Sequence, residues 1–263
     1  RAPAAGRVLV IGSLGGFAPA ASAAAGAVRS GQLTAREADA LLPACVCSGP
    51  SFVILAVGQS MLGSAELGVL LFLAQVAAGY LSAALLARLG GTLGSRAHPA
   101  VPTASQPLRL DGIIAQAAQT YLKLCGFVLF FRMLAAGAGE VLPSGAGVFC
   151  AMLLEVCSGC DLAAKSGRFA SMLCCAALSV QGLSVLMQVR TICPPEMTLR
   201  LLYRARLLHL PLSLLVFYLL LPQRAQETFS TLCGRVTTMR RLPPDCALLV
   251  FLGCCFVVCE LKI

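Results

Sequence analysis

Long apolar runs without charge constrain this chain more than any other feature. The run from Leu67 to Leu86 contains no charged residue, and a helix needs about 20 apolar residues to cross the hydrocarbon core of a bilayer. Hydrophobic residues make up 58% of the 263 residues and charged residues only 12%, whereas a soluble domain usually has about 25% charged residues. The chain is therefore predicted to be an integral membrane protein that has the lipid bilayer as a partner.

Hydropathy along the chain predicts about eight hydrophobic segments. An all-α polytopic membrane protein is the fold class that accommodates them, because only helices and closed barrels satisfy the backbone in lipid. Besides the first run, the segments are 113–139, 141–160, 207–222 and 246–259, together with three interrupted runs at 8–28, 41–62 and 169–189.

The chain divides into two halves. Residues 1–89 form the first half, which we expect to lack its N-terminal helices, and residues 111–222 form the second. The loop at 90–110 between them is rich in Gly, Pro, Ser and Thr, which is typical of a solvated connection. Residues 223–263 are predicted to form a basic loop and a C-terminal transmembrane helix.

The two halves repeat an order of features, although their residue identity is low. In the first half, a hairpin-like stretch of small residues at 12–19 precedes a helix capped by Thr34 and Glu37, as in a capping box. An apolar run broken at 47–50 follows. Broken helices at corresponding places in two halves are the best sequence indication of a transporter binding site.

In the second half, the interruption at 155–159 precedes a short charged piece and an apolar run broken at 179–184. Glu155 is the strongest single candidate for a functional residue, because a carboxylate inside an apolar run is costly and faces a cavity or a partner. It would bind a donor group of the substrate or a coupling proton; the alternative is a structural carboxylate, and for the broken segments a simple kink. The predicted substrate-binding residues are Ser48, Gly49, Pro50, Glu155, Ser158, Gly159, Gln181, Gly182, Ser184 and Gln188.

Other function classes find less support. The net charge of +9 comes from basic residues at the ends of apolar runs, as in membrane proteins, so no nucleic acid is predicted as a partner. No phosphate-binding loop, zinc-protease helix or Ser, His, Asp arrangement is found, so we predict no enzyme, no cofactor and no metal. The pair Cys157 and Cys160 has the spacing of a redox or zinc site, and an intramembrane redox enzyme stays as an alternative.

Three charged or titratable residues in apolar runs are interpreted as structural. Lys123 and Arg132 are predicted to reach the membrane interface with their long side chains. His209 is predicted to make a hydrogen bond in helix packing.

At these same features the chain resembles the sporulation integral membrane protein YlbJ (SpoVV) family, whose members carry the nucleoside-recognition or gate domain. Order and approximate spacing hold from about residue 1 to residue 222. The family's usual lysine in the first motif is replaced by Ser22, and Lys165 is a candidate substitute. The matching stretches are 12–22, 31–42, 48–52 with 57–58, 154–159, 178–188 and 207–213.

The resemblance implies a fold akin to concentrative nucleoside transporters, with re-entrant hairpins and broken transmembrane helices. It also implies a role in endospore formation, in which the protein moves dipicolinic acid across the outer forespore membrane. Dipicolinate is a small dianion, which suits opened helix N-termini. The alternatives are a nucleoside or nucleobase transporter and a non-transporting membrane scaffold in spore assembly; related transporters also suggest a homo-oligomer.

Overall fold

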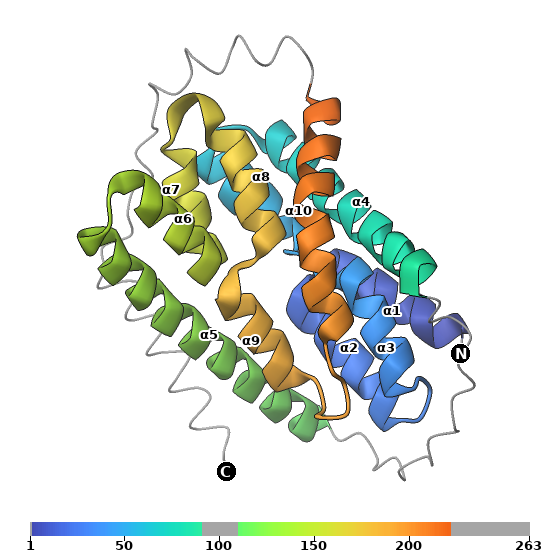
Figure 1. Cartoon of the computed structure of the whole chain (residues 1–263). Coiled ribbons are helices and arrows are strands. Elements are labelled where there is room, and N and C mark those ends of the chain that lie inside the picture. Colours follow the sequence, from blue (N-terminus) through green and yellow to red (C-terminus); the bar gives the residue numbers. More distant parts are fainter. Residues whose placement is uncertain (1, 91–109, 222–263) are drawn as a thin grey trace.

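The computed structural model describes residues 2–90 and 110–221, and every regular element in these ranges is a helix (Figure 1). The predicted helix at 246–259 and almost all of the loop at 90–110 lie outside the described residues. The elements are α1 (Ala2–Gly15), α2 (Phe17–Arg29), α3 (Ala35–Cys45), η1 (Ser51–Met61), α4 (Ala65–Gly90), α5 (Leu110–Val141), α6 (Ser144–Leu154), α7 (Val156–Ala164), η3 (Gly167–Phe169), α8 (Ala170–Val180), α9 (Gly182–Ile192) and α10 (Arg200–Leu220).

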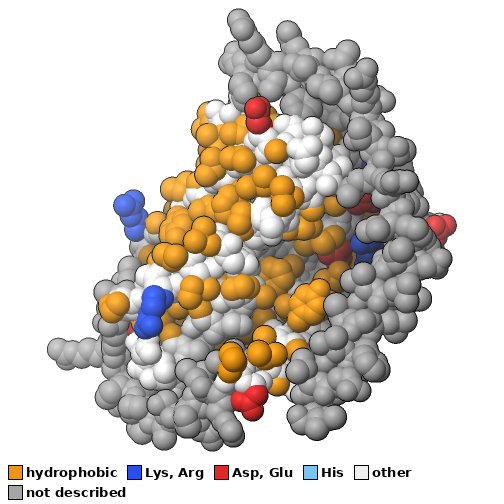
Figure 2. Space-filling model, turned by 180° about the vertical axis from the view of Figure 1, so that it is seen from behind, with side chains coloured by type: hydrophobic (Ala, Val, Ile, Leu, Met, Phe, Trp, Pro, Cys, Tyr) orange, Lys and Arg blue, Asp and Glu red, His pale blue; other side chains and the backbone are white. Residues whose placement is uncertain are grey.

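Within the described residues, four helical segments are long and apolar enough to cross a membrane: 65–89, 110–141, 167–192 and 200–220. Large apolar side chains are exposed along them, such as Phe130 on α5 and Leu219 on α10. The face drawn in Figure 2 carries a broad area of hydrophobic side chains with few charges. Such a surface is suited to lipid rather than to water, and the protein is a helical membrane protein, as the sequence predicts.

Several of the predicted hydrophobic segments are not single helices but pairs of short ones. α1 and α2 pack against each other across Gly16, and α6 and α7 do so across Glu155, so each pair is a hairpin. α3 and η1 are separated by the non-helical residues 46–49, and α8 and α9 by Gln181. The order hairpin, broken helix, long helix therefore occurs twice, ending with α4 in the first half and α10 in the second.

The long helices α4 and α10 pack against each other and against the first broken segment of their own half. α4 packs along α10, α3 packs on α4, and α8 packs on α10 (Figure 1). Across the halves, α2 contacts α9 while α7 contacts η1. Small residues permit this close packing: Ala20, Ala21, Ala24 and Ala25 of α2 are fully buried, and small side chains let membrane helices approach closely.

The predicted capping box is confirmed at the start of α3. The hydroxyl of Thr34 accepts a hydrogen bond from the backbone N–H of Glu37 at 3.2 Å, and the Glu37 carboxylate accepts one from the N–H of Thr34 at 2.8 Å. This reciprocal cap satisfies two N–H groups that the first turn of a helix leaves without partners.

Candidate functional site

The two interruptions of each half meet. In the first half, a Cβ placed on Gly16 would lie 2.9 Å from the backbone nitrogen of Gly49. In the second half, a Cβ placed on Gly182 would lie 3.0 Å from the backbone nitrogen of Glu155. Both Gly16 and Gly182 have a positive φ, of 87° and 69°, a conformation that glycine adopts without strain. The turn of each hairpin thus rests on the break of the helix that follows it.

A cavity of about 150 Å³ lies where the two halves meet. A single water requires roughly 10–15 Å³ on this measure, so the cavity has room for a small organic molecule or several waters. It contains four of the predicted residues, Ser48, Gly49, Glu155 and Gln188. The remaining lining residues are Phe17, Phe52, Val128, Val156, Cys157 and Val185.

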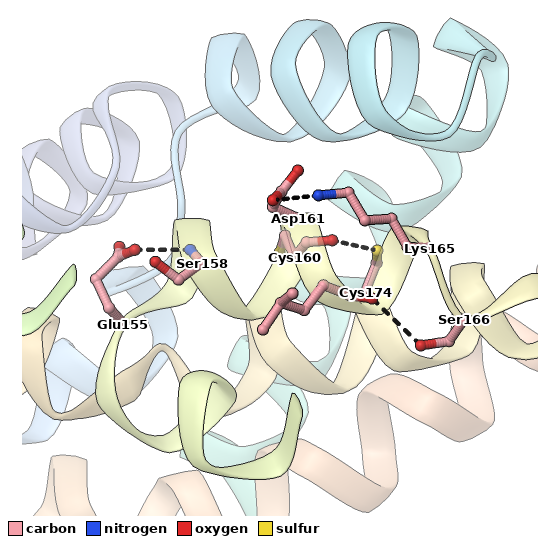
Figure 3. Close-up of polar contacts among 8 residues, drawn as sticks. Glu155, Ser158, Cys160, Asp161, Lys165, Ser166 and Cys174 are labelled. Carbon is pink, nitrogen blue, oxygen red and sulfur yellow. Dashed lines mark hydrogen bonds and ion pairs between the residues drawn. The ribbon is translucent and has the colours of Figure 1, made fainter. Parts of the chain in front are cut away.

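Glu155 caps α7 from the turn of the second hairpin (Figure 3). Its extended backbone, with φ −150° and ψ 126°, ends α6, and its carboxylate accepts hydrogen bonds from the N–H groups of Cys157 at 2.8 Å and Ser158 at 2.7 Å. The side chain is only 1% exposed. The positive end of the α7 dipole stabilises this charge, and each carboxylate oxygen keeps a lone pair for a donor in the cavity.

Four helices begin at this cavity. The cavity is lined near the N-termini of α2 by Phe17, of η1 by Phe52, of α7 by Val156 and of α9 by Val185. Glu155 caps α7, but within the described part of the chain α2, η1 and α9 have no hydrogen bond from an N-cap side chain. Helix N-termini with unpaired N–H groups attract anions, so these first turns offer N–H donors to a bound molecule.

The other six predicted residues shape the site without lining it. Gln181, in a left-handed conformation with φ 61°, forms the break between α8 and α9 together with Gly182. Ser184 accepts a hydrogen bond from the amide of Gln188 at 2.9 Å, which orients that side chain. The N–H of Ser158 is one of the two donors to Glu155.

Gly159 and Pro50 have backbone roles. A Cβ on Gly159 would lie 2.7 Å from the Cα of Met152, so this glycine permits the close approach of α7 to α6. Pro50 precedes η1 with helical φ −60° and ψ −37°, where its missing N–H is not needed. The backbone is extended at Val46, with φ −82° and ψ 91°, so the carbonyl of Val46 lies outside the hydrogen-bond ladder of α3. That carbonyl accepts side-chain hydrogen bonds instead, from Gln181 at 3.4 Å and from Arg206.

Sequence reasoning did not select a second polar cluster between α4, α8 and α10. The amide nitrogen of Gln75 donates to the hydroxyl of Ser179 at 3.0 Å, and Ser179 is hydrogen-bonded to Ser213. Arg206, His209 and Ser213 follow at intervals of three and four along α10, which places them on one face of the helix. This spacing is the signal that could have identified them.

The structural interpretation of His209 is confirmed. It is 1% exposed, and its Nε2 lies 3.0 Å from the carbonyl oxygen of Gln75 on α4. Lys123 and Arg132 are exposed along α5; that their side chains reach the membrane interface stays a prediction. Lys165 does not serve the cavity: it is exposed and pairs with Asp161 at 2.8 Å (Figure 3).

Comparisons of the chain with known families, with curated proteins and with solved structures give no match.

Proposed function

We propose that this membrane protein is a transporter of a small organic anion, and that dipicolinic acid, moved across the outer forespore membrane during endospore formation, is the first substrate to test. One observation carries the proposal: four helix N-termini and a buried carboxylate meet at one cavity inside an apolar helical protein. Irregular backbone at membrane depth is tolerated where it lines a cavity, and discontinuous helices with their N-termini at a substrate are a recurring feature of transporters.

In this proposal the two hairpins, α1 with α2 and α6 with α7, are re-entrant, and the broken helices α3–η1 and α8–α9 span the membrane, as in concentrative nucleoside transporters. The first turns of α2, η1 and α9 offer N–H groups to the anion. Glu155 accepts a hydrogen bond from a donor of the substrate or carries a coupling proton. Its own charge is balanced by the N–H groups of α7.

A nucleoside or nucleobase is the second candidate substrate, and Gln188 favours it. The amide of Gln188 is 1% exposed, its oxygen has no hydrogen-bond partner among the described residues, and the side chain lines the cavity. An amide can both donate to and accept from the edge of a base, whereas its oxygen would repel a carboxylate.

The test is uptake by the full chain reconstituted into liposomes. Radiolabelled dipicolinate should accumulate, an excess of uridine should not compete, and Glu155→Gln should reduce the initial rate about tenfold or more, as expected when a binding or protonating group is lost. Glu66→Gln, at an exposed position near the start of α4, is the control and should retain the wild-type rate.

Uptake of labelled uridine without uptake of dipicolinate would replace the first candidate with the second. If neither molecule moves, and spores of a strain without this protein contain normal dipicolinate, transport is refuted. A membrane scaffold then becomes the better interpretation.

A further inference from the structure

Arg206 is a buried cation that has no counterion among the described residues. It lies on the membrane-crossing helix α10, which passes beside α3, α4 and α8 (Figure 1), and its side chain is 8% exposed. One of its nitrogens, Nη2, donates to the carbonyl of Val46. Its Nε and Nη1 are buried and have no hydrogen-bond partner among the described residues.

The buried carboxylates of the described chain are committed to other groups. Asp39 accepts from the backbone N–H groups of Thr198 and Leu199, both at 3.0 Å. Glu155 accepts from the first turn of α7. A guanidinium left without an anion inside a membrane protein is costly, and such residues are kept mainly where they serve a function.

The position of Arg206 relates it to the breaks. The carbonyl that it binds also accepts from Gln181, so the break of the first half and the break of the second half meet at Val46. Arg206 does not itself line the cavity, but Val46 lies two residues before Ser48, which does. Arg206 thus occupies the point at which a movement of either broken helix changes the partners of its guanidinium.

We propose that Arg206 is an anion subsite that binds one carboxylate group of the ligand through its free Nε–H and Nη1–H groups. This inference rests on the proposed transport function. A single carboxylate is the class that fits, because one guanidinium neutralises one charge and is well matched to a carboxylate. A phosphate dianion would need a second cation, and no other Lys or Arg is buried among the described residues.

The probes are picolinate and picolinamide, which differ in a carboxylate against a neutral amide. Binding to the purified full chain in detergent is measured by isothermal titration calorimetry. Wild type should bind picolinate at least tenfold more tightly than picolinamide. Arg206→Gln, which removes the charge, should reduce this preference to about twofold or less, and Arg206→Lys should keep part of it. Arg204→Gln, at an exposed position of the same helix, should behave as wild type.

Equal affinities of wild type for the two probes would overturn the proposal without any variant, so a failure of Arg206→Gln to fold does not prevent the test. A preference that persists in a folded Arg206→Gln protein would also overturn it. Arg206-dependent binding of picolinate without dipicolinate uptake by liposomes would refute the transport function and leave the subsite standing. Uptake of dipicolinate by liposomes, together with a preference for picolinate that does not depend on Arg206, would support the transport function and refute the subsite.

Discussion

Gly182→Ala tests whether the break of the second broken helix rests on the turn of the second hairpin. Gly182 has a φ of 69°, and a left-handed conformation costs an L-residue about 1–2 kcal/mol. The added methyl group would lie 3.0 Å from the backbone nitrogen of Glu155 and from two backbone atoms of Leu154. Overpacking of this kind costs about 1–3 kcal/mol. Alanine also lowers the conformational entropy of the unfolded chain, which offsets about 0.4–1 kcal/mol of this loss. We expect the free energy of unfolding to fall by about 3 kcal/mol.

Gly63→Ala is the matched control. Gly63 also has a positive φ, of 75°, but a Cβ there would meet nothing within 4 Å. Only the conformational strain remains, partly offset by the entropy of the unfolded chain, so the expected loss is about 1 kcal/mol. The difference between the two variants, about 2 kcal/mol, isolates the contact between the helix break and the hairpin.

Thermal unfolding in detergent micelles can be followed with a thiol-reactive maleimide dye. The chain has no tryptophan to report unfolding, but several free cysteines are buried, such as Cys174 and Cys175, and react only when the core opens. At about 2–4 °C per kcal/mol for a chain of this size, Gly182→Ala should lower the midpoint by about 6–12 °C and Gly63→Ala by about 2–4 °C. Equal shifts would refute the contact and, with it, the geometry of the site.

Three further changes have defined outcomes, measured by the same unfolding assay. Asp39→Asn should cost about 2 kcal/mol, because its carboxylate holds the loop before α10 through buried, charge-assisted hydrogen bonds; Asp161→Asn, which breaks an exposed ion pair, should cost under about 0.5 kcal/mol. Thr34→Ala should cost about 1 kcal/mol by removing the cap of α3, and an unchanged unfolding midpoint would show that the cap does not stabilise the protein. Gln75→Leu should cost about 1–3 kcal/mol, because Ser179 and the α8 backbone lose a buried donor; an unchanged unfolding midpoint would contradict this.

The sequence by itself determined the class of protein and the places where its helices break. Length, charge and apolar runs predict membrane helices because lipid imposes a length and excludes charge. Small residues, Pro50 and isolated polar residues then mark the interruptions, because glycine relaxes the backbone and proline lacks an N–H. The start of α3 could also be predicted from the sequence, because a capping box is a local motif that spans four residues.

Only the tertiary structure decided which of these breaks meet and which residues face the cavity. Ser48 and Gln188 line one cavity although they belong to different halves, and the hydrogen bond from Arg206 to Val46 joins residues 160 positions apart. In the sequence, Arg206 lies among the basic residues that begin an apolar run, a pattern typical of the membrane interface. Its burial follows from the packing of α10 against α3 and from the carbonyl of Val46, whose extended backbone leaves it without a helical partner. Local chemistry therefore set the elements, whereas long-range packing, which a one-dimensional pattern does not encode, set the site.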